Sequence, residues 1–168
     1  MKVLVIENTL PFGKAIKQVL KDGRRGKVFL VQGLVNLEGQ VVAQTHDGRK
    51  MPLDLADFDL ALVDGNVPKG FVASDEVVKR LTEQGVSCVA ISALPDANKE
   101  LVNAGAKLQV RKHVLICAAA AGCMKTAELA LVSPVVQARL ELLDKRVSSD
   151  KVFRQKGEKI VSRHLQAA

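Results

Sequence analysis

Short apolar runs alternate along the chain with segments in which apolar residues recur every three or four positions. The apolar runs have the length of β-strands and lie at 2–6, 28–31, 60–63, 86–91 and about 108–111. The helical segments begin near Thr9, Ser74 and Asp96 and end before Asp22-Gly23, Gly85 and Ala104-Gly105. Strands that alternate with helices in this way predict a parallel α/β sheet with helical crossovers.

Two regions depart from this alternation. Residues 33–57 contain several glycines and a proline, and apolar and polar residues alternate between Val41 and Thr45, which predicts a β-hairpin or an irregular excursion in place of a helix. Later in the chain, an Ala-rich segment at about 114–132 predicts one long helix. Ser133-Pro134 then interrupts it, because proline lacks the helical N–H donor.

The chain beyond Pro134 has a pattern of its own. An apolar stripe at 4-3-4 spacing comprises Val136, Leu140, Leu143 and Val147. It has two interpretations, packing against the sheet domain or a homodimer seam formed through 129–147. A further helix is expected at 151–165. We therefore predict two parts, a sheet domain at 1–132 and a basic helical extension at 133–168.

The composition suits a globular protein. The chain has 168 residues, of which 48% are hydrophobic, and because Trp and Tyr are absent the core must be largely aliphatic. Three cysteines at 88, 117 and 123 show no metal-ligand spacing, so we interpret them as reduced thiols of a cytoplasmic protein. No apolar stretch has the length of a membrane span and the N-terminus does not resemble a secretory signal, so no membrane insertion is expected.

The net charge of +7 is concentrated in part at the C-terminal end, where eight lysines and arginines stand against four acids between 135 and 168. Such an excess suits a nucleic acid, an acidic protein or an acidic membrane surface. The stretch lacks interleaved aromatic residues for base stacking, and a solvated helix face explains it equally well. We expect a protein as the output partner, with a nucleic acid as the less favoured alternative.

Polar side chains follow the ends of four predicted strands. Glu7 and Asn8 follow the first strand, and Asp64 ends the strand that begins at residue 60. Ser92 and Lys112 follow the last two strands. In an open α/β sheet, ligands bind just outside the carboxyl ends of the strands. We therefore expect these five side chains to form a site on one edge of the sheet.

These residues and their order resemble the receiver domain of bacterial response regulators over about residues 1–130. Glu7-Asn8 stands in the place of the acidic pair, and Asp64 stands in the place of the phosphoacceptor. Ser92 ends the hydroxyl-bearing strand, and Lys112 follows the glycine of the Gly-Ala turn by seven residues. The resemblance implies a flavodoxin-like, five-stranded parallel sheet flanked by helices, in which the excursion replaces one helix.

The resemblance also implies a phosphoaspartate at Asp64, formed with a phosphoryl group from a sensor histidine kinase or a phosphotransfer protein. Ser92 and Lys112 are then expected to contact the phosphoryl group. Glu7, Asn8 and Asp64 are expected to hold Mg²⁺ through oxygen ligands. Beyond self-phosphorylation and autodephosphorylation at Asp64, no enzymatic activity is expected.

The chain departs from the family pattern at several positions. Asn8 replaces the usual second aspartate, which removes a negative charge and weakens the attraction for Mg²⁺. Gln109 stands at the aromatic switch position, and His113 replaces the proline after the lysine. The weakened acidic pair supports a second hypothesis, a degenerate pseudo-receiver that binds partners without being phosphorylated. The three histidines, His46, His113 and His164, are scattered and are assigned no role.

Overall fold

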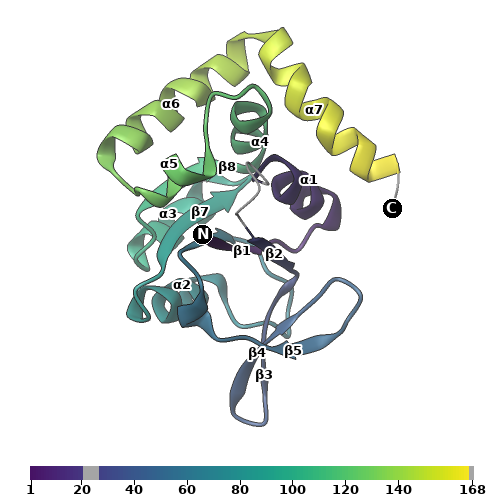
Figure 1. Ribbon diagram of the computed structural model, residues 1–168, viewed down its shortest axis with the longest axis vertical. Helices are drawn as coiled ribbons and strands as arrows, with labels where there is room; N and C mark the ends of the chain where they lie inside the picture. The colour runs from purple at the N-terminus through teal and green to yellow at the C-terminus, as the bar shows by residue number, and fades with distance from the viewer. Residues whose placement is uncertain (21–26, 167–168) are drawn as a thin grey trace.

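The computed structural model describes residues 1–20 and 27–166, which form a five-stranded parallel sheet with its covering elements (Figure 1). The strands lie in the order β2-β1-β6-β7-β8. Their bounds are β1 (Lys2–Ile6), β2 (Lys27–Val31), β6 (Leu60–Asp64), β7 (Ser87–Ser92) and β8 (Leu108–Arg111). This order confirms the predicted flavodoxin-like fold class. The predicted end of the first helix at Asp22-Gly23 lies outside the described residues.

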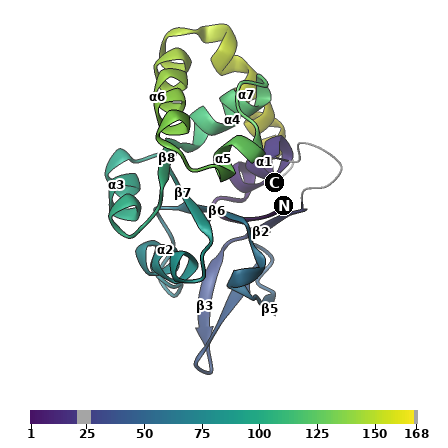
Figure 2. The same ribbon diagram turned by 60° about the vertical axis from the view of Figure 1, so that its left-hand side comes forward.

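Helices cover both faces of the sheet (Figures 1 and 2). Four of the helices that contact it are α1 (Leu10–Leu20), α2 (Ser74–Glu83), α3 (Pro95–Asn103) and α4 (Lys112–Ala120). Val3 and Val5 of β1 face the core under α1 and α4, whereas Leu4 and Ile6 face the core under α2 and α3. Successive side chains of a strand point to opposite faces, so one apolar run supplies both cores.

A second, antiparallel sheet is inserted between β2 and β6. It comprises β3 (Gly33–Leu37), β4 (Gln40–Gln44) and β5 (Lys50–Pro52), and the 3₁₀ helix η1 (Leu55–Asp57) returns the chain to β6. Glu38 and Gly39 join β3 to β4 with φ of 50° and 82°, as a two-residue hairpin turn requires. The excursion predicted at 33–57 is therefore a three-stranded sheet, which projects from the body of the molecule (Figure 2).

The Ala-rich segment does not form the single helix predicted at 114–132. Instead α4 begins already at Lys112 and ends at Ala120, and α5 (Thr126–Ala130) is a separate short helix. Gly122, at φ 70°, ends α4 with a Schellman motif, in which two backbone N–H groups bond back to carbonyls of its last turn. The last carbonyls of the helix are thereby satisfied, which stabilises the break.

Two further helices, α6 (Pro134–Ser149) and α7 (Lys151–Gln166), lie over α1 and α4 (Figure 1). Ser133 caps α6, because its Oγ accepts a hydrogen bond from the N–H of Val136 at 3.3 Å. The stripe that begins at Val136 is buried in the same core as α1 and α4. The four side chains of the stripe therefore pack within the chain, and a homodimer through 129–147 stays a prediction. The division at 132/133 stays a prediction.

All three cysteines are free thiols, with Cys88 and Cys117 buried and Cys123 half-buried, as predicted. Burial raises the pKa of the Cys88 thiol to about 12, so that this thiol stays protonated at neutral pH. Among the described helices, none is both long enough and apolar enough to cross a bilayer.

Candidate functional site

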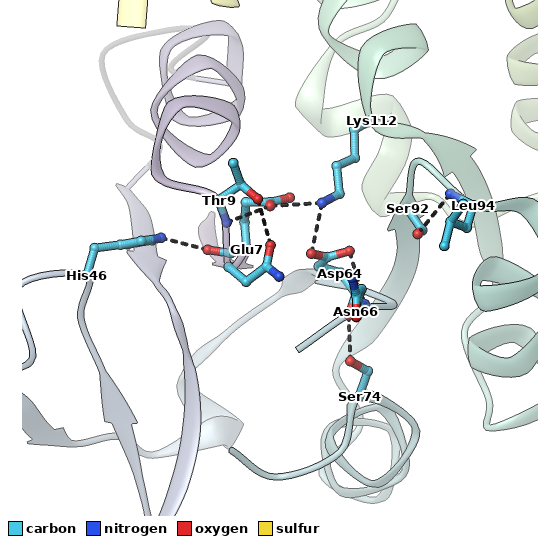
Figure 3. A network of polar contacts seen from close by, with 10 residues as sticks. Glu7, Thr9, His46, Asp64, Asn66, Ser74, Ser92, Leu94 and Lys112 are labelled. Carbon is cyan, nitrogen blue, oxygen red and sulfur yellow. Dashed lines mark hydrogen bonds and ion pairs between the residues drawn. The ribbon is translucent and has the colours of Figure 1, made fainter. Parts of the chain in front are cut away.

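The C-terminal ends of the parallel strands bring the predicted residues to one edge of the sheet (Figure 3). Glu7 directly follows β1, and Asp64 is the last residue of β6. Ser92 ends β7, and Lys112 begins α4 directly after β8. The register pairs Ile6 with Val63, Asp64 with Ile91 and Ser92 with Arg111, so the four strand ends stand level with one another.

Lys112 joins the two acids. Its Nζ lies 2.8 Å from Glu7 Oε1 and 2.8 Å from Asp64 Oδ2, and both carboxylates are fully buried. A buried carboxylate is unfavourable unless it is paired, and removing one partner of a buried ion pair costs about 3–5 kcal/mol, against about 0–1 kcal/mol for an exposed pair. Lys112 therefore stabilises both buried acids, which would otherwise lack a positive partner.

Asp64 is also fixed through its own backbone and the loop that follows it. Its Oδ1 accepts a hydrogen bond from the N–H of Asn66 at 3.2 Å, and its carbonyl accepts one from Ser74 Oγ at 2.6 Å. The predicted helix near Ser74 is α2, which begins at Ser74 and has Ala73 as its N-cap. The Ser74 hydroxyl links the start of α2 to the end of β6.

Glu7 has one satisfied and one unsatisfied oxygen. Oε1 accepts from the N–H of Thr9 at 2.9 Å as well as from Lys112, whereas Oε2 is buried without a hydrogen-bond partner among the described residues. Burial raises the pKa of Glu7, the charge of Asp64 raises it further, and Lys112 opposes both effects. An unpaired buried acceptor next to a second acid is a place for a further proton or cation.

The side chains of Asn8 and Ser92 stand beside this cluster without a hydrogen bond to it. The half-buried Asn8 accepts from Thr9 Oγ1 through Oδ1 at 2.8 Å. Ser92 is buried, and its Oγ accepts from the N–H of Leu94 at 3.1 Å. This bond uses an oxygen lone pair and leaves the hydroxyl proton for another acceptor. The structure therefore joins Glu7, Asp64 and Lys112 directly, and it places Asn8 and Ser92 next to them.

The oxygen donors at this edge suit a hard divalent cation, although they are few. The described residues contain no group of three or more His, Cys, Asp or Glu side chains placed to hold a metal. The donors in the cluster are Asp64, the unpaired Glu7 Oε2 and the amide oxygen of Asn8. Carboxylate and amide oxygens are the donors that Mg²⁺ accepts, with water completing its coordination. These residues therefore fit Mg²⁺, in a site that supplies few protein ligands.

The structure adds one residue that the sequence did not indicate. His46 lies in the turn between β4 and β5, and its Nε2 is 2.7 Å from the backbone oxygen of Glu7 (Figure 3). The two residues are 39 positions apart. No motif or spacing connects a histidine in an inserted hairpin to the end of β1, so only the tertiary structure reveals the contact.

No protein-family model and no curated protein matches the chain. Its fold is similar to the signal receiver domain of a DNA-binding response regulator from Colwellia psychrerythraea, with 18% identity, a TM-score of 0.47 and coverage of 67% of this chain and 85% of that chain. A response regulator receiver protein from Pseudoalteromonas atlantica has 10% identity and a TM-score of 0.47, with coverage of 69% of this chain and 91% of that chain. The Mn²⁺-bound response regulator Rcp1 has 14% identity and a TM-score of 0.44, with coverage of 88% of this chain and 92% of that chain. At these values the likeness carries no argument about function, which rests on the site itself.

Proposed function

We propose that this chain is a response regulator of a two-component signalling system and that Asp64 accepts a phosphoryl group. The observation that carries the proposal is the position of Lys112 Nζ, 2.8 Å from Asp64 Oδ2 and from Glu7 Oε1, at the carboxyl edge of the parallel sheet. Ligands of such sheets bind at this edge. A nucleophilic carboxylate with a fixed ammonium beside it is suited to phosphoryl transfer.

In the proposed reaction a carboxylate oxygen of Asp64 forms a bond to phosphorus while the bond from phosphorus to the donor atom breaks. The bonding electron pair leaves with the donor, a phosphohistidine of a sensor histidine kinase or of a phosphotransfer protein. Lys112 stabilises the charge on the phosphoryl oxygens, and the Ser92 hydroxyl donates a hydrogen bond to one of them. Hydrolysis of the acyl phosphate returns Asp64 to its free form. Signalling then proceeds through contacts with an output protein.

The proposal includes Mg²⁺, held by Glu7, Asn8 and Asp64. When bound, the ion would supply positive charge to the phosphoryl oxygens. Asn8 offers a neutral oxygen where a second aspartate would offer a charge, and Lys112 already neutralises one of the two acids. We therefore propose a weak site that fills only at high concentrations of the ion.

The burial of Asp64 favours a second candidate function. Its side chain is fully buried, so a donor reaches it only after the side chains above it move aside. A chain in which they do not move would be a pseudo-receiver, an interaction module with the same fold whose Asp64 is never phosphorylated. The two candidates differ in one measurable property, the gain of a phosphoryl group at Asp64.

Intact-mass spectrometry after treatment with acetyl phosphate and Mg²⁺ tests the proposal. We expect the wild type to gain one phosphoryl group that hydroxylamine removes, as expected for an acyl phosphate, and Asp64→Asn to gain none. Asp75→Asn is the matched control, because Asp75 is a half-exposed acid of α2, and it should be labelled like the wild type. Labelling of Asp64→Asn would show that Asp64 is not the acceptor. No labelling of the wild type at high Mg²⁺ would favour the pseudo-receiver.

A further inference from the structure

The backbone carbonyls of both acids in the site accept a hydrogen bond from a side chain outside the main sheet. Ser74 Oγ donates to the carbonyl of Asp64 at 2.6 Å, and His46 Nε2 lies 2.7 Å from the carbonyl of Glu7 (Figure 3). Ser74 comes from the helix that directly follows β6, whereas His46 comes from the inserted sheet. The insertion thus supplies for β1 the same kind of contact that α2 supplies for β6.

The turn that carries His46 is well defined. The N–H of Thr45 donates to the carbonyl of Arg49 at 2.9 Å, and the N–H of Gly48 donates to the carbonyl of Thr45 at 2.9 Å. Gly48 has a φ of 83°, a conformation that favours glycine, and Arg49 Nε donates to Asp47 Oδ2 at 2.8 Å. His46 is therefore presented to Glu7 by an ordered turn.

The chemistry of the contact fixes the state of the imidazole. A carbonyl oxygen can only accept, so Nε2 must carry the proton that is donated to Glu7. Burial lowers the pKa of His46, and the charge of Lys14 acts in the same direction, against the bond to Glu7 and the charge of Asp47. At neutral pH His46 is thus a neutral donor, and it adds no charge to the site.

The inserted sheet also contacts the loop that follows Asp64. The N–H of Val72 donates to the carbonyl of Leu34 in β3 at 2.7 Å. A Cβ added at Gly33 would lie 2.3 Å from a ring carbon of Phe71, so the two segments approach each other as closely as a glycine allows. One inserted element therefore contacts both the turn after β1 and the loop after β6.

We propose that His46 is a positioning residue of the site and that the inserted sheet acts through it on Glu7 and Asn8. By fixing the carbonyl of Glu7, His46 sets the turn in which the N–H of Thr9 bonds to Glu7 Oε1 and which carries Oε2 and the Asn8 amide, the donors proposed for the cation. The inference rests on the proposed function for its cation, although the positioning itself does not depend on phosphorylation.

Three variants of the full chain test the inference. His46→Ala removes the donor, His46→Gln places an amide N–H at a similar reach, and His164→Ala is the matched control, because His164 lies on α7 and contacts Gln18. Amide hydrogen exchange of Thr9 measures the order of the turn, and electron paramagnetic resonance of free Mn²⁺ measures cation affinity. We expect His46→Ala to speed the exchange of Thr9 and weaken Mn²⁺ binding about three- to tenfold, the loss typical of one hydrogen bond. His46→Gln should restore most of both, and His164→Ala should change neither.

The outcomes separate the inference from the proposed function. Unchanged Thr9 exchange and Mn²⁺ affinity in His46→Ala would overturn the inference, even if the wild type is phosphorylated at Asp64. Equal losses in His46→Ala and His46→Gln would also overturn it, because the donated hydrogen bond would not be what matters. If the wild type neither binds Mn²⁺ nor accepts a phosphoryl group, the proposed function fails, and Thr9 exchange alone still decides whether His46 positions the turn.

Discussion

The two carboxylate oxygens of Glu7 differ in their hydrogen bonding. Lys112 and the N–H of Thr9 both reach Oε1, whereas Oε2 is buried without a partner among the described residues. Burial and the neighbouring Asp64 together outweigh Lys112, so the pKa of Glu7 in the folded chain lies above its usual value of 4.5. The folded state therefore favours the protonated form of Glu7 relative to the unfolded state.

This raised pKa predicts how stability depends on pH. The stability that Glu7 contributes to the folded state is fully present below about pH 4.5 and is lost as pH rises through its raised pKa in the folded state. The loss amounts to about 1.4 kcal/mol for each pH unit by which the folded-state pKa exceeds the unfolded-state pKa. Glu7→Gln resembles the protonated form and does not titrate. We therefore expect its free energy of unfolding, relative to the wild type, to increase from pH 4.5 to pH 8.

Urea unfolding followed by circular dichroism between pH 4.5 and 8 measures this difference. The contributions of the other acids to the pH dependence cancel, because both proteins contain them. Glu141→Gln, at an exposed acid of α6, is the control and should give a difference that stays nearly constant with pH. A constant difference for Glu7→Gln as well would show that the burial of Glu7 does not favour its proton.

Residues at strand ends were predictable, and residues of the insertion were not. The sequence places Glu7, Asp64 and Lys112 after apolar runs, and parallel strands must bring such positions to one edge, so their meeting follows from the topology. The contact of Lys112 with Glu7 in addition to Asp64 depends on side-chain geometry. The position of His46 depends on where the inserted sheet lies relative to the end of β1, which no pattern in the sequence indicates.

At the scale of elements, the crossing of α7 over α4 depends on Gly157. A Cβ added there would lie 2.4 Å from Cys117 Sγ and 3.0 Å from the Cys117 backbone. We expect Gly157→Ala to force the helices apart and to lower the free energy of unfolding by about 1–3 kcal/mol, as overpacking does. The better helix propensity of alanine, about 1 kcal/mol, offsets part of this cost. Urea unfolding monitored by circular dichroism provides the value.

Two further variants make the test of the α4–α7 crossing specific. Lys156→Ala, at the exposed neighbouring position of α7, should leave stability almost unchanged. Adding Cys117→Ala to Gly157→Ala removes the sulfur and should recover part of the loss, but not all of it, because the backbone contact remains. If the free energy of unfolding of Gly157→Ala equals or exceeds that of the wild type, α4 and α7 can accommodate the added methyl group without moving apart.

Element types were predicted better than element ends. Alternating polarity and scattered glycines in 33–57 predicted extended structure, and the segment folds as a three-stranded sheet. The run at 114–132 was predicted as one helix, because its alanines favour a helix throughout and outweigh one internal glycine. Gly122 adopts a positive φ and its local Schellman bonds end α4, a stop that the helix propensity of the surrounding alanines does not indicate.

At the scale of the whole molecule, the C-terminal helices complete the main sheet. Gln137 Oε1 in α6 accepts from the backbone N–H of Gln109 at 2.9 Å, so α6 covers the outer edge of β8. Arg111 forms an ion pair with Asp144 of α6, and the next residue, Lys112, holds the acids of the site. A helix that shields a strand edge prevents pairing with other chains. The residue that pairs with α6 and the residue that pairs with the acids of the site are thus consecutive in the sequence.

This arrangement predicts that residues 1–132 do not fold stably alone. The side chains that α6 and α7 bury in the shared core are Val136, Leu140, Leu143, Val147 and Phe153. At about 1.5–3 kcal/mol each, their burial contributes roughly 10 kcal/mol, which is close to the total of about 5–15 kcal/mol for a typical domain. Truncation after Val132 also exposes the apolar surfaces of α1 and α4 that these side chains cover.

Urea unfolding of the truncated chain, followed by circular dichroism, tests this expectation. We expect no cooperative transition for 1–132 and an intermediate midpoint for 1–150, which keeps α6 and its stripe but lacks α7. A transition of 1–132 with the wild-type midpoint would instead establish the sheet domain as an independent unit. In that case the side chains of α6 and α7 would contribute little to the stability of the sheet domain, although they are buried in its core.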